Sequence, residues 1–135
     1  MEEDKRSSDV VEKRRFLRFL VRYKSIIYSD RDIIPGTVLD VSEGGVGVFV
    51  PQRLQFHQEV FIKIKFKLGQ AHKSHVQFRA LVVWTEDCFI NNMCACGLEI
   101  KEITHTDFDV YKALLEELYV RDCIHSKYER KKSVI

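Results

Sequence analysis

Three arginines near the N-terminus, Arg14, Arg15 and Arg18, have the chemistry to bind an anionic ligand. They lie in the segment 13–24, which carries six positively charged side chains and no acidic one. A guanidinium group is planar and always charged, so it can clamp a phosphate, stack on a base or donate two parallel hydrogen bonds to guanine. Several such groups suit a ligand that is anionic and carries guanine. The alternative is a basic run that is only solvated.

A second motif, Asp-x-Ser-x-x-Gly, is formed by Asp40, Ser42 and Gly45, with Gly44 inside it. A carboxylate can accept hydrogen bonds from the N1–H and N2–H₂ edge of guanine, and a serine hydroxyl adds a polar contact. The two glycines allow backbone N–H groups to approach a ligand closely. The same residue types are common in ordinary turns, which is the alternative interpretation of this motif.

Metal binding and catalysis have weaker signals. Cys94 and Cys96 could form a metal site with His72 and His75, but the cysteines have one residue between them, where zinc sites usually have two to four. Two small buried side chains on one face of a strand are the simpler interpretation, and we predict no metal site. The chain has no P-loop, HExxH or GxSxG motif, and its five histidines are scattered. We therefore predict that it is not an enzyme and has no catalytic residues.

Hydrophobic alternation with a period of two dominates the chain from residue 19 onward. Ile62, Ile64 and Phe66 alternate with lysines, which predicts a strand with one buried and one solvated face. By the same pattern the predicted strands are 19–28, 37–41, 46–50, 60–68, 76–84 and 93–100. The predicted connections are a turn at 29–36 around Pro35-Gly36, a hairpin loop at 42–45, a polar loop at 69–74 and a turn at 87–92.

The period changes after residue 100, where the apolar residues from Phe108 to Leu118 follow helical spacing. Thr106 with Asp109 resembles a capping box at the start of this helix. Six strands followed by one helix predict a mainly β fold, a six-stranded antiparallel barrel with a C-terminal helix. We expect the helix to cover one mouth of the barrel or to pack along its side.

Composition predicts one folded domain in 135 residues, because hydrophobic residues make up 45% and charged residues 31% of the chain. The formal net charge is only +2, which argues against a protein coated in positive charge. We expect a flexible arm at 1–11, the domain at 12–120 and a basic, frayed tail at 121–135. Because no apolar run is long enough to span a membrane and the first ten residues are polar, we predict a cytoplasmic location.

Together, the two motifs resemble those of the PilZ domain family, bacterial receptors for the second messenger cyclic di-GMP. Arg14 and Arg18 match the family's Arg-x-x-x-Arg motif, and Asp40, Ser42 and Gly45 match its Asp/Asn-x-Ser-x-x-Gly motif. Residues 36–46 and the closing strand at 96–100 are also similar to the family. The resemblance covers about residues 12 to 120. One departure is the segment Phe56-His57-Gln58, where the family often has a glycine before the fourth strand.

The resemblance implies a PilZ-type barrel that binds cyclic di-GMP, needs no other cofactor and changes its surface for a partner protein. The ligand-binding residues that it implies are Arg14, Arg15, Arg18, Asp40, Ser42, Gly44, Gly45 and Trp84. The arginines would contact phosphates and guanines, and Asp40 and Ser42 would bind a guanine edge. Trp84 lies where some members place an aromatic ring beside a guanine. The alternative for Trp84 is a core position that continues the apolar face of 76–82.

Two other functions stay open at this point. The chain could be a PilZ-type interaction module without ligand binding, although its motifs are intact. It could also bind nucleic acid or another anionic surface without specificity, through the segment 13–24 and the lysines at 63, 65 and 67. That function would show a steep dependence on salt and little preference among anions. We expect no specific nucleic acid and no membrane span.

Overall fold

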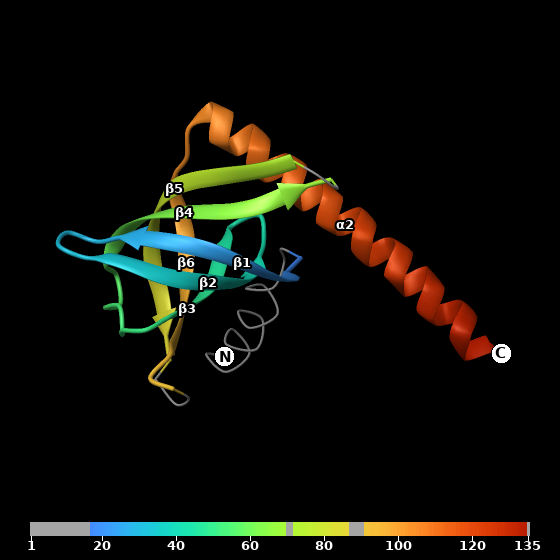
Figure 1. Cartoon of the computed structure of the whole chain (residues 1–135), viewed down its shortest axis with the longest axis horizontal. Coiled ribbons are helices and arrows are strands. Elements are labelled where there is room, and N and C mark those ends of the chain that lie inside the picture. The colour runs from blue at the N-terminus through green and yellow to red at the C-terminus, as the bar shows by residue number, and fades with distance from the viewer. Residues whose placement is uncertain (1–16, 70–71, 87–90, 135) are drawn as a thin grey trace, which may run out of the picture.

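Six antiparallel strands close into a barrel in the order β1-β2-β3-β6-β5-β4, with β4 returning to β1 (Figure 1). The computed structural model describes residues 17–69, 72–86 and 91–134. The strands are β1 (Phe19–Tyr28), β2 (Ile33–Val41), β3 (Gly45–Val50), β4 (Glu59–Leu68), β5 (His72–Thr85) and β6 (Cys94–Glu102), and they are followed by the helix α2 (His105–Val134). The predicted mainly β fold with a C-terminal helix is confirmed.

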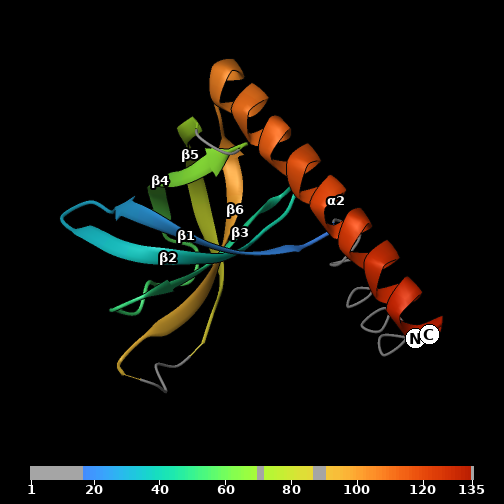
Figure 2. The ribbon, with the colours of Figure 1, turned by 45° about the vertical axis from the view of Figure 1, so that its right-hand side comes forward.

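The core fills the barrel because one side of each strand is apolar. On β4, Ile62, Ile64 and Phe66 are buried, whereas Lys65 and Lys67 are exposed. The inward side chains of all six strands form one cluster, which three buried residues of α2 complete: Tyr111, Leu114 and Leu118. Their spacing of three and four places them on one side of the helix. The helix therefore packs one side against the barrel. Figure 2 shows its ribbon beside the strands.

Two bulges decide which side chains face outward. The register of β2 against β3 shifts between Val38 and Asp40, and that of β5 against β6 shifts between Val82 and Trp84. A bulge adds a residue to one strand and so changes which face the following side chains occupy. Trp84 consequently lies outside the core cluster and is half-buried. The alternative core position for Trp84 assumed that the alternation of 76–82 continues to residue 84. The alternation stops at this bulge, so Trp84 does not continue the buried face.

Two predicted connections are wrong. β2 begins at Ile33 and includes Pro35 and Gly36, so the turn spans only 29–32. Pro35 pairs with Ile26 of β1 but lies beyond the pairing of β2 with β3, where a free strand edge tolerates a residue without an N–H. The predicted polar loop at 69–74 is also too long, since β5 begins at His72. Backbone pairing with β4 continues to His72 and does not depend on apolar side chains.

In the segment that departs from the family pattern, His57 adopts a backbone conformation that is typical of glycine. His57 has a φ of 68°, in the left-handed region that glycine adopts without steric cost. Its backbone N–H donates to the carbonyl oxygen of Val82 at 2.8 Å, and its ring stacks on Phe56. Histidine is among the residues that tolerate this region better than most. The turn before β4 thus keeps a glycine-like backbone with another side chain.

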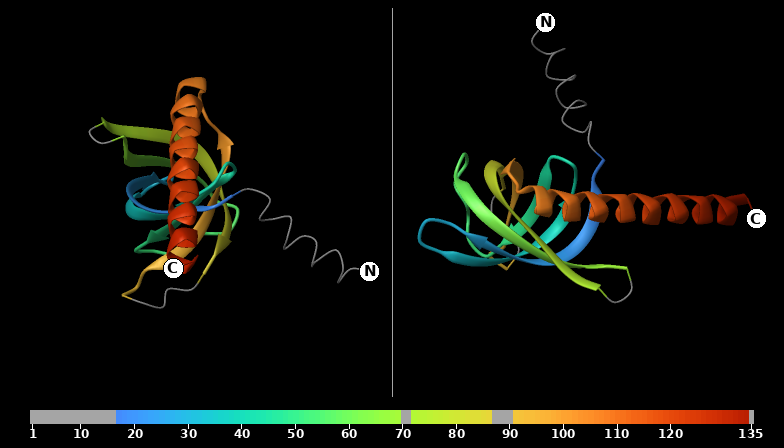
Figure 3. Two further views of the ribbon diagram at one scale, coloured as in Figure 1. Left: turned by 90° about the vertical axis from the view of Figure 1, so that its right-hand side faces the viewer. Right: turned by 90° about the horizontal axis from the view of Figure 1, so that it is seen from above.

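The helix begins two residues earlier than the predicted capping box places it, and it ends much later than the apolar spacing predicts. The capping pair is Thr104 and Asp107, since the backbone N–H of Asp107 donates to Oγ1 of Thr104 at 3.2 Å. The predicted pair, Thr106 and Asp109, is wrong. The segment 121–134, which we expected to be frayed, continues α2 beyond the barrel (Figure 3). No glycine or proline interrupts the sequence after residue 104, so nothing stops the helix there. Among the described residues, no helix has a stretch apolar enough to cross a membrane.

Candidate ligand-binding site

The turn between β2 and β3 carries Ser42, Gly44 and Gly45 and is fixed by hydrogen bonds. The backbone N–H of Ser42 donates to the carbonyl oxygen of Gly45 at 2.9 Å, and the Ser42 hydroxyl donates to the same oxygen at 3.2 Å. The N–H of Ile100 on β6 donates to the carbonyl oxygen of Gly44 at 2.9 Å. A Cβ at Gly45 would lie 2.0 Å from the carbonyl oxygen of Leu98. Glycine is therefore required at position 45 by the close approach of β3 and β6.

Tyr111 of α2 ties the helix to this turn. Its hydroxyl donates to the carbonyl oxygen of Ser42 in a short hydrogen bond, and the Gly45 carbonyl oxygen lies 3.2 Å from the same hydroxyl. The ring meets Phe78 edge to face at 5.8 Å between centroids. Burial raises the pKa of the Tyr111 hydroxyl well above its usual range, and the negative charge of Asp40 raises it further. The hydroxyl thus stays a neutral donor. From the sequence, Tyr111 was predicted only as part of an apolar helical stripe.

Removing this hydroxyl should weaken the fold and show a defined pH dependence. Tyr111→Phe leaves the Ser42 carbonyl without this donor, so we expect the free energy of unfolding to fall by about 1 to 2 kcal/mol at neutral pH. A tyrosine whose pKa is raised on folding contributes stability that is full below its ordinary pKa of 10.0 and is lost as the pH rises above it. Urea unfolding of both proteins from pH 7 to 11 should show their difference shrinking above pH 10. A constant difference would contradict this role for the hydroxyl.

Asp40 and Trp84 lie at the two ends of a row that crosses four strands on the outer wall of the barrel. In this row Asp40 pairs with Gly47, Gly47 with Gly97, and Gly97 with Trp84. A Cβ at Gly47 would lie 2.5 Å from a carboxylate oxygen of Asp40, and one at Gly97 would lie 2.0 Å from the indole nitrogen of Trp84. Both side chains therefore lie over glycine backbone. The row thus has a carboxylate and an aromatic ring, which lie on a glycine floor formed by Gly47 and Gly97.

The Arg-x-x-x-Arg motif adjoins this wall at one end. Arg14 and Arg15 lie outside the described residues. Arg18 is exposed immediately before β1, whose Phe19 pairs with Val41, so Arg18 lies at the same end of the β1–β2 pair as Ser42. The structure thus brings Arg18, Asp40 and the 42–45 turn together at one end of the barrel. Trp84 belongs to the same outer wall, three strands from Asp40.

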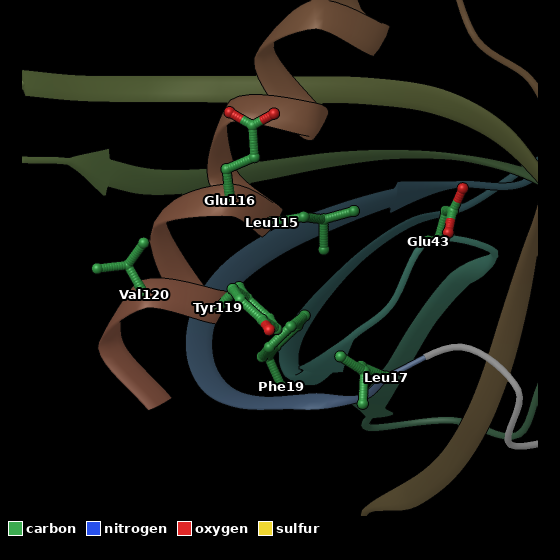
Figure 4. A pocket seen from close by; sticks show the side chains of 7 residues that line it. All are labelled: Leu17, Phe19, Glu43, Leu115, Glu116, Tyr119 and Val120. Atoms are coloured by element: carbon green, nitrogen blue, oxygen red, sulfur yellow. The ribbon is translucent and has the colours of Figure 1, made fainter. Parts of the chain in front are cut away.

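A groove beside the turn was not predicted from the sequence. Its lining includes Leu17 just before β1, Phe19 at the start of β1, and Leu115 and Tyr119 of α2. Glu43 of the turn lies on the other side (Figure 4). Val120 and Glu116 complete the lining. Arg121 holds the helix here, because its guanidinium group donates to the carbonyl oxygen of Leu20 at 3.1 Å. The only sequence signal for the groove is that apolar residues of α2 continue past Leu118.

Of the candidate metal ligands, His75 continues the outward row of Lys65 and so lies away from the two cysteines, and the side chain of His72 lies outside what the structure describes. Cys94 and Cys96 are buried in the barrel core. Burial raises the pKa of the Cys96 thiol to about 12, so this thiol is protonated at neutral pH. No group of three or more His, Cys, Asp and Glu side chains suited to a metal occurs among the described residues.

Comparisons with known proteins agree with the resemblance seen in the sequence. The family model of the PilZ domain matches residues 12–119. Among solved structures, the inhibitor of motility MotI/DgrA from Bacillus subtilis has a TM-score of 0.67 and 20% identity over 82% of this chain. The chain spans 51% of that protein. The PilZ domain with c-di-GMP of YcgR from Escherichia coli has a TM-score of 0.61 and 16% identity, covering 85% of this chain and 98% of that one. No curated protein matches the sequence.

Proposed function

This chain belongs to the PilZ domain family, and we propose that it is a receptor for cyclic di-GMP that signals to a partner protein. The observation that carries the proposal is the row from Asp40 to Trp84, with Arg18 and the 42–45 turn at its end. In this proposal the chain acts by binding and not by catalysis. The ligand is the only small molecule that it needs.

Each part of the wall suits one part of the ligand. The carboxylate of Asp40 can accept hydrogen bonds from the N1–H and N2–H₂ groups of a guanine. Gly47 and Gly97 let the carboxylate of Asp40 and the indole of Trp84 lie close against the sheet, and the indole offers a stacking surface for a base. Arg18, together with Arg14 and Arg15, supplies guanidinium groups for the two phosphates and the second guanine. The solved complex of the YcgR PilZ domain supports the choice of ligand at the level of the family.

In this proposal, ligand binding signals to the partner protein by changing the charge on the surface of the barrel. Cyclic di-GMP carries two phosphate charges, so its binding neutralises part of the segment 13–24 and covers the outer wall of β2, β3 and β6. The Tyr111 hydroxyl binds the Ser42 carbonyl, so a change in the turn also reaches α2. A partner protein that reads this end of the barrel would meet a different surface with and without ligand.

Trp84 provides a direct test because it is the only tryptophan in the chain. If a guanine stacks on its indole, cyclic di-GMP should quench the intrinsic fluorescence in a saturable way, and GTP at the same concentration should not. The matched control is Trp84→Phe, which should still bind the ligand in a calorimetric titration but lose the optical signal. Fluorescence that is unchanged at saturating cyclic di-GMP would contradict the stacking of a guanine on Trp84.

A further inference from the structure

Five lysines gather on the outer wall formed by β1, β4 and β5. On β4, Lys63, Lys65 and Lys67 alternate with buried apolar residues and therefore point outward. Lys24 of β1 pairs directly with Lys65, and Lys73 of β5 pairs directly with Lys67. His75 continues the row of Lys24 and Lys65 onto a third strand. We call this set of five lysines the lysine face: Lys24, Lys63, Lys65, Lys67 and Lys73.

The lysine face is not neutralised within the part of the chain that the structure describes. None of its five ammonium groups forms an ion pair with a described carboxylate. Two acidic residues of α2 that contact β5 and the β4–β5 connection accept backbone hydrogen bonds: Asp107 accepts from the N–H of Gln77, and Glu117 accepts from that of Gly69. Like charges directly opposite each other on neighbouring strands destabilise a sheet. The lysine face contains two such pairs, Lys24 with Lys65 and Lys67 with Lys73. An acidic partner bound there would reduce the repulsion between these ammonium groups.

An exposed apolar row adjoins the lysine face on the same wall. Tyr28 of β1 pairs with Phe61 of β4, and their rings lie 6.3 Å apart between centroids. Tyr28 is 37% and Phe61 38% exposed, and Ile33, which pairs with Tyr28 from β2, is 71% exposed. From Phe61 to Lys67 the wall runs for roughly 20 Å at 3.3 Å per residue. One continuous surface therefore offers apolar side chains at one end and positive charge at the other.

This wall lies opposite the candidate ligand site. In the closed order β1-β2-β3-β6-β5-β4, the strands β1 and β4 face β6 and β3 across the barrel. The glycine floor belongs to β3 and β6. A molecule on the lysine face would leave the row from Asp40 to Trp84 uncovered, so both could be occupied at once.

We infer that the lysine face and the adjoining row of Tyr28 and Phe61 form a docking surface for a protein segment that is acidic at one end and apolar at the other. A nucleic acid has uniform charge and would use only the positive half. A protein segment can use both halves, and aromatic side chains are enriched where proteins bind each other. That cyclic di-GMP controls the docked partner rests on the proposed function. The docking itself can be measured without cyclic di-GMP.

The test uses a labelled helical peptide of about 16 residues, roughly 24 Å long at 1.5 Å per residue, with glutamates in its first turns and Leu and Phe in its last. Fluorescence anisotropy with the full chain at physiological salt should show binding that is about tenfold tighter than that of a scrambled peptide of the same composition. The double variant Lys65→Glu/Lys67→Glu should weaken binding by at least about tenfold. Phe61→Ser should weaken it while leaving the salt dependence unchanged.

The matched control is Lys101→Glu/Lys112→Glu, which changes the net charge equally on β6 and α2 and should bind the peptide as the wild type does. Unchanged binding after reversal of Lys65 and Lys67 would overturn the inference. So would equal or tighter binding of a duplex DNA, or of vesicles with anionic lipid, that depends on the same two lysines. Titration of Lys65→Glu/Lys67→Glu with cyclic di-GMP should be normal, and this separates a failure of docking from a failure of the proposed receptor function.

Discussion

Gly45→Ala should lower the free energy of unfolding by about 3 kcal/mol, because the added Cβ meets backbone and not a movable side chain. The Cβ position lies 2.0 Å from the carbonyl oxygen of Leu98 and 3.1 Å from the Cα of Glu99. Relief would require β3 and β6 to separate at the point where they pair. Chemical denaturation followed by circular dichroism measures the effect as a shift of the midpoint.

Gly47→Ala is the matched control for this prediction, since Gly47 lies on the same strand. Here the Cβ would meet the carboxylate of Asp40 at 2.5 Å, and a carboxylate can rotate away. We expect Gly47→Ala to cost less than about 1 kcal/mol of stability, but to weaken cyclic di-GMP binding because Asp40 is displaced. If Gly45→Ala were as stable as the wild type, the close approach of β3 and β6 at the turn would be contradicted.

Asp40→Ala should reduce the affinity for cyclic di-GMP by about 10- to 100-fold, as expected for the loss of hydrogen bonds to a charged group worth about 1.5 to 3 kcal/mol. The direction of this change in affinity separates two explanations of binding. A receptor that reads a guanine edge loses affinity when the carboxylate is removed. A purely electrostatic binder of anions gains affinity, because a negative charge has been taken away.

Glu43→Ala is the control for Asp40→Ala, because it removes the same charge from the neighbouring turn. Glu43 is exposed and has no place in the row from Asp40 to Trp84. We expect its removal to change the affinity by less than about twofold. Tighter binding of cyclic di-GMP by both variants would support a nonspecific anion binder and contradict the proposed recognition of guanine.

The barrel itself was predictable because alternation is a local property of each strand. Ile62, Ile64 and Phe66 show the buried face of β4 in the sequence, and the same alternation located the other five strands, although it missed the starts of β2 and β5. Pro35 misled the prediction of β2, because a proline is tolerated wherever one edge of a strand is free, and edges are defined only by the assembled sheet. The length of α2 was missed because residues beyond 120 lack the apolar stripe that marked its start.

The candidate site was predictable in its residue types and less so in its arrangement. The Asp-x-Ser-x-x-Gly motif locates the turn, but the role of Gly45 depends on Leu98 of a distant strand. The outward position of Trp84 depends on a bulge that has no signal in the sequence. Gly47 and Gly97 pair across β3 and β6, and only the register shows that they form one floor. The hydrogen bond from Tyr111 to the turn likewise arises from tertiary packing.

Isothermal titration of cyclic di-GMP into the full chain tests the central claim most directly. Alongside the wild type, Arg14→Ala and Arg18→Ala remove the two arginines of the motif, and Arg22→Ala, an exposed arginine within β1, serves as the matched control. We predict saturable binding to the wild type and to Arg22→Ala, with affinity at least about 100-fold weaker in each motif variant, and no binding of GTP. The absence of heat, together with no competition against a labelled ligand at millimolar cyclic di-GMP, would contradict the receptor function.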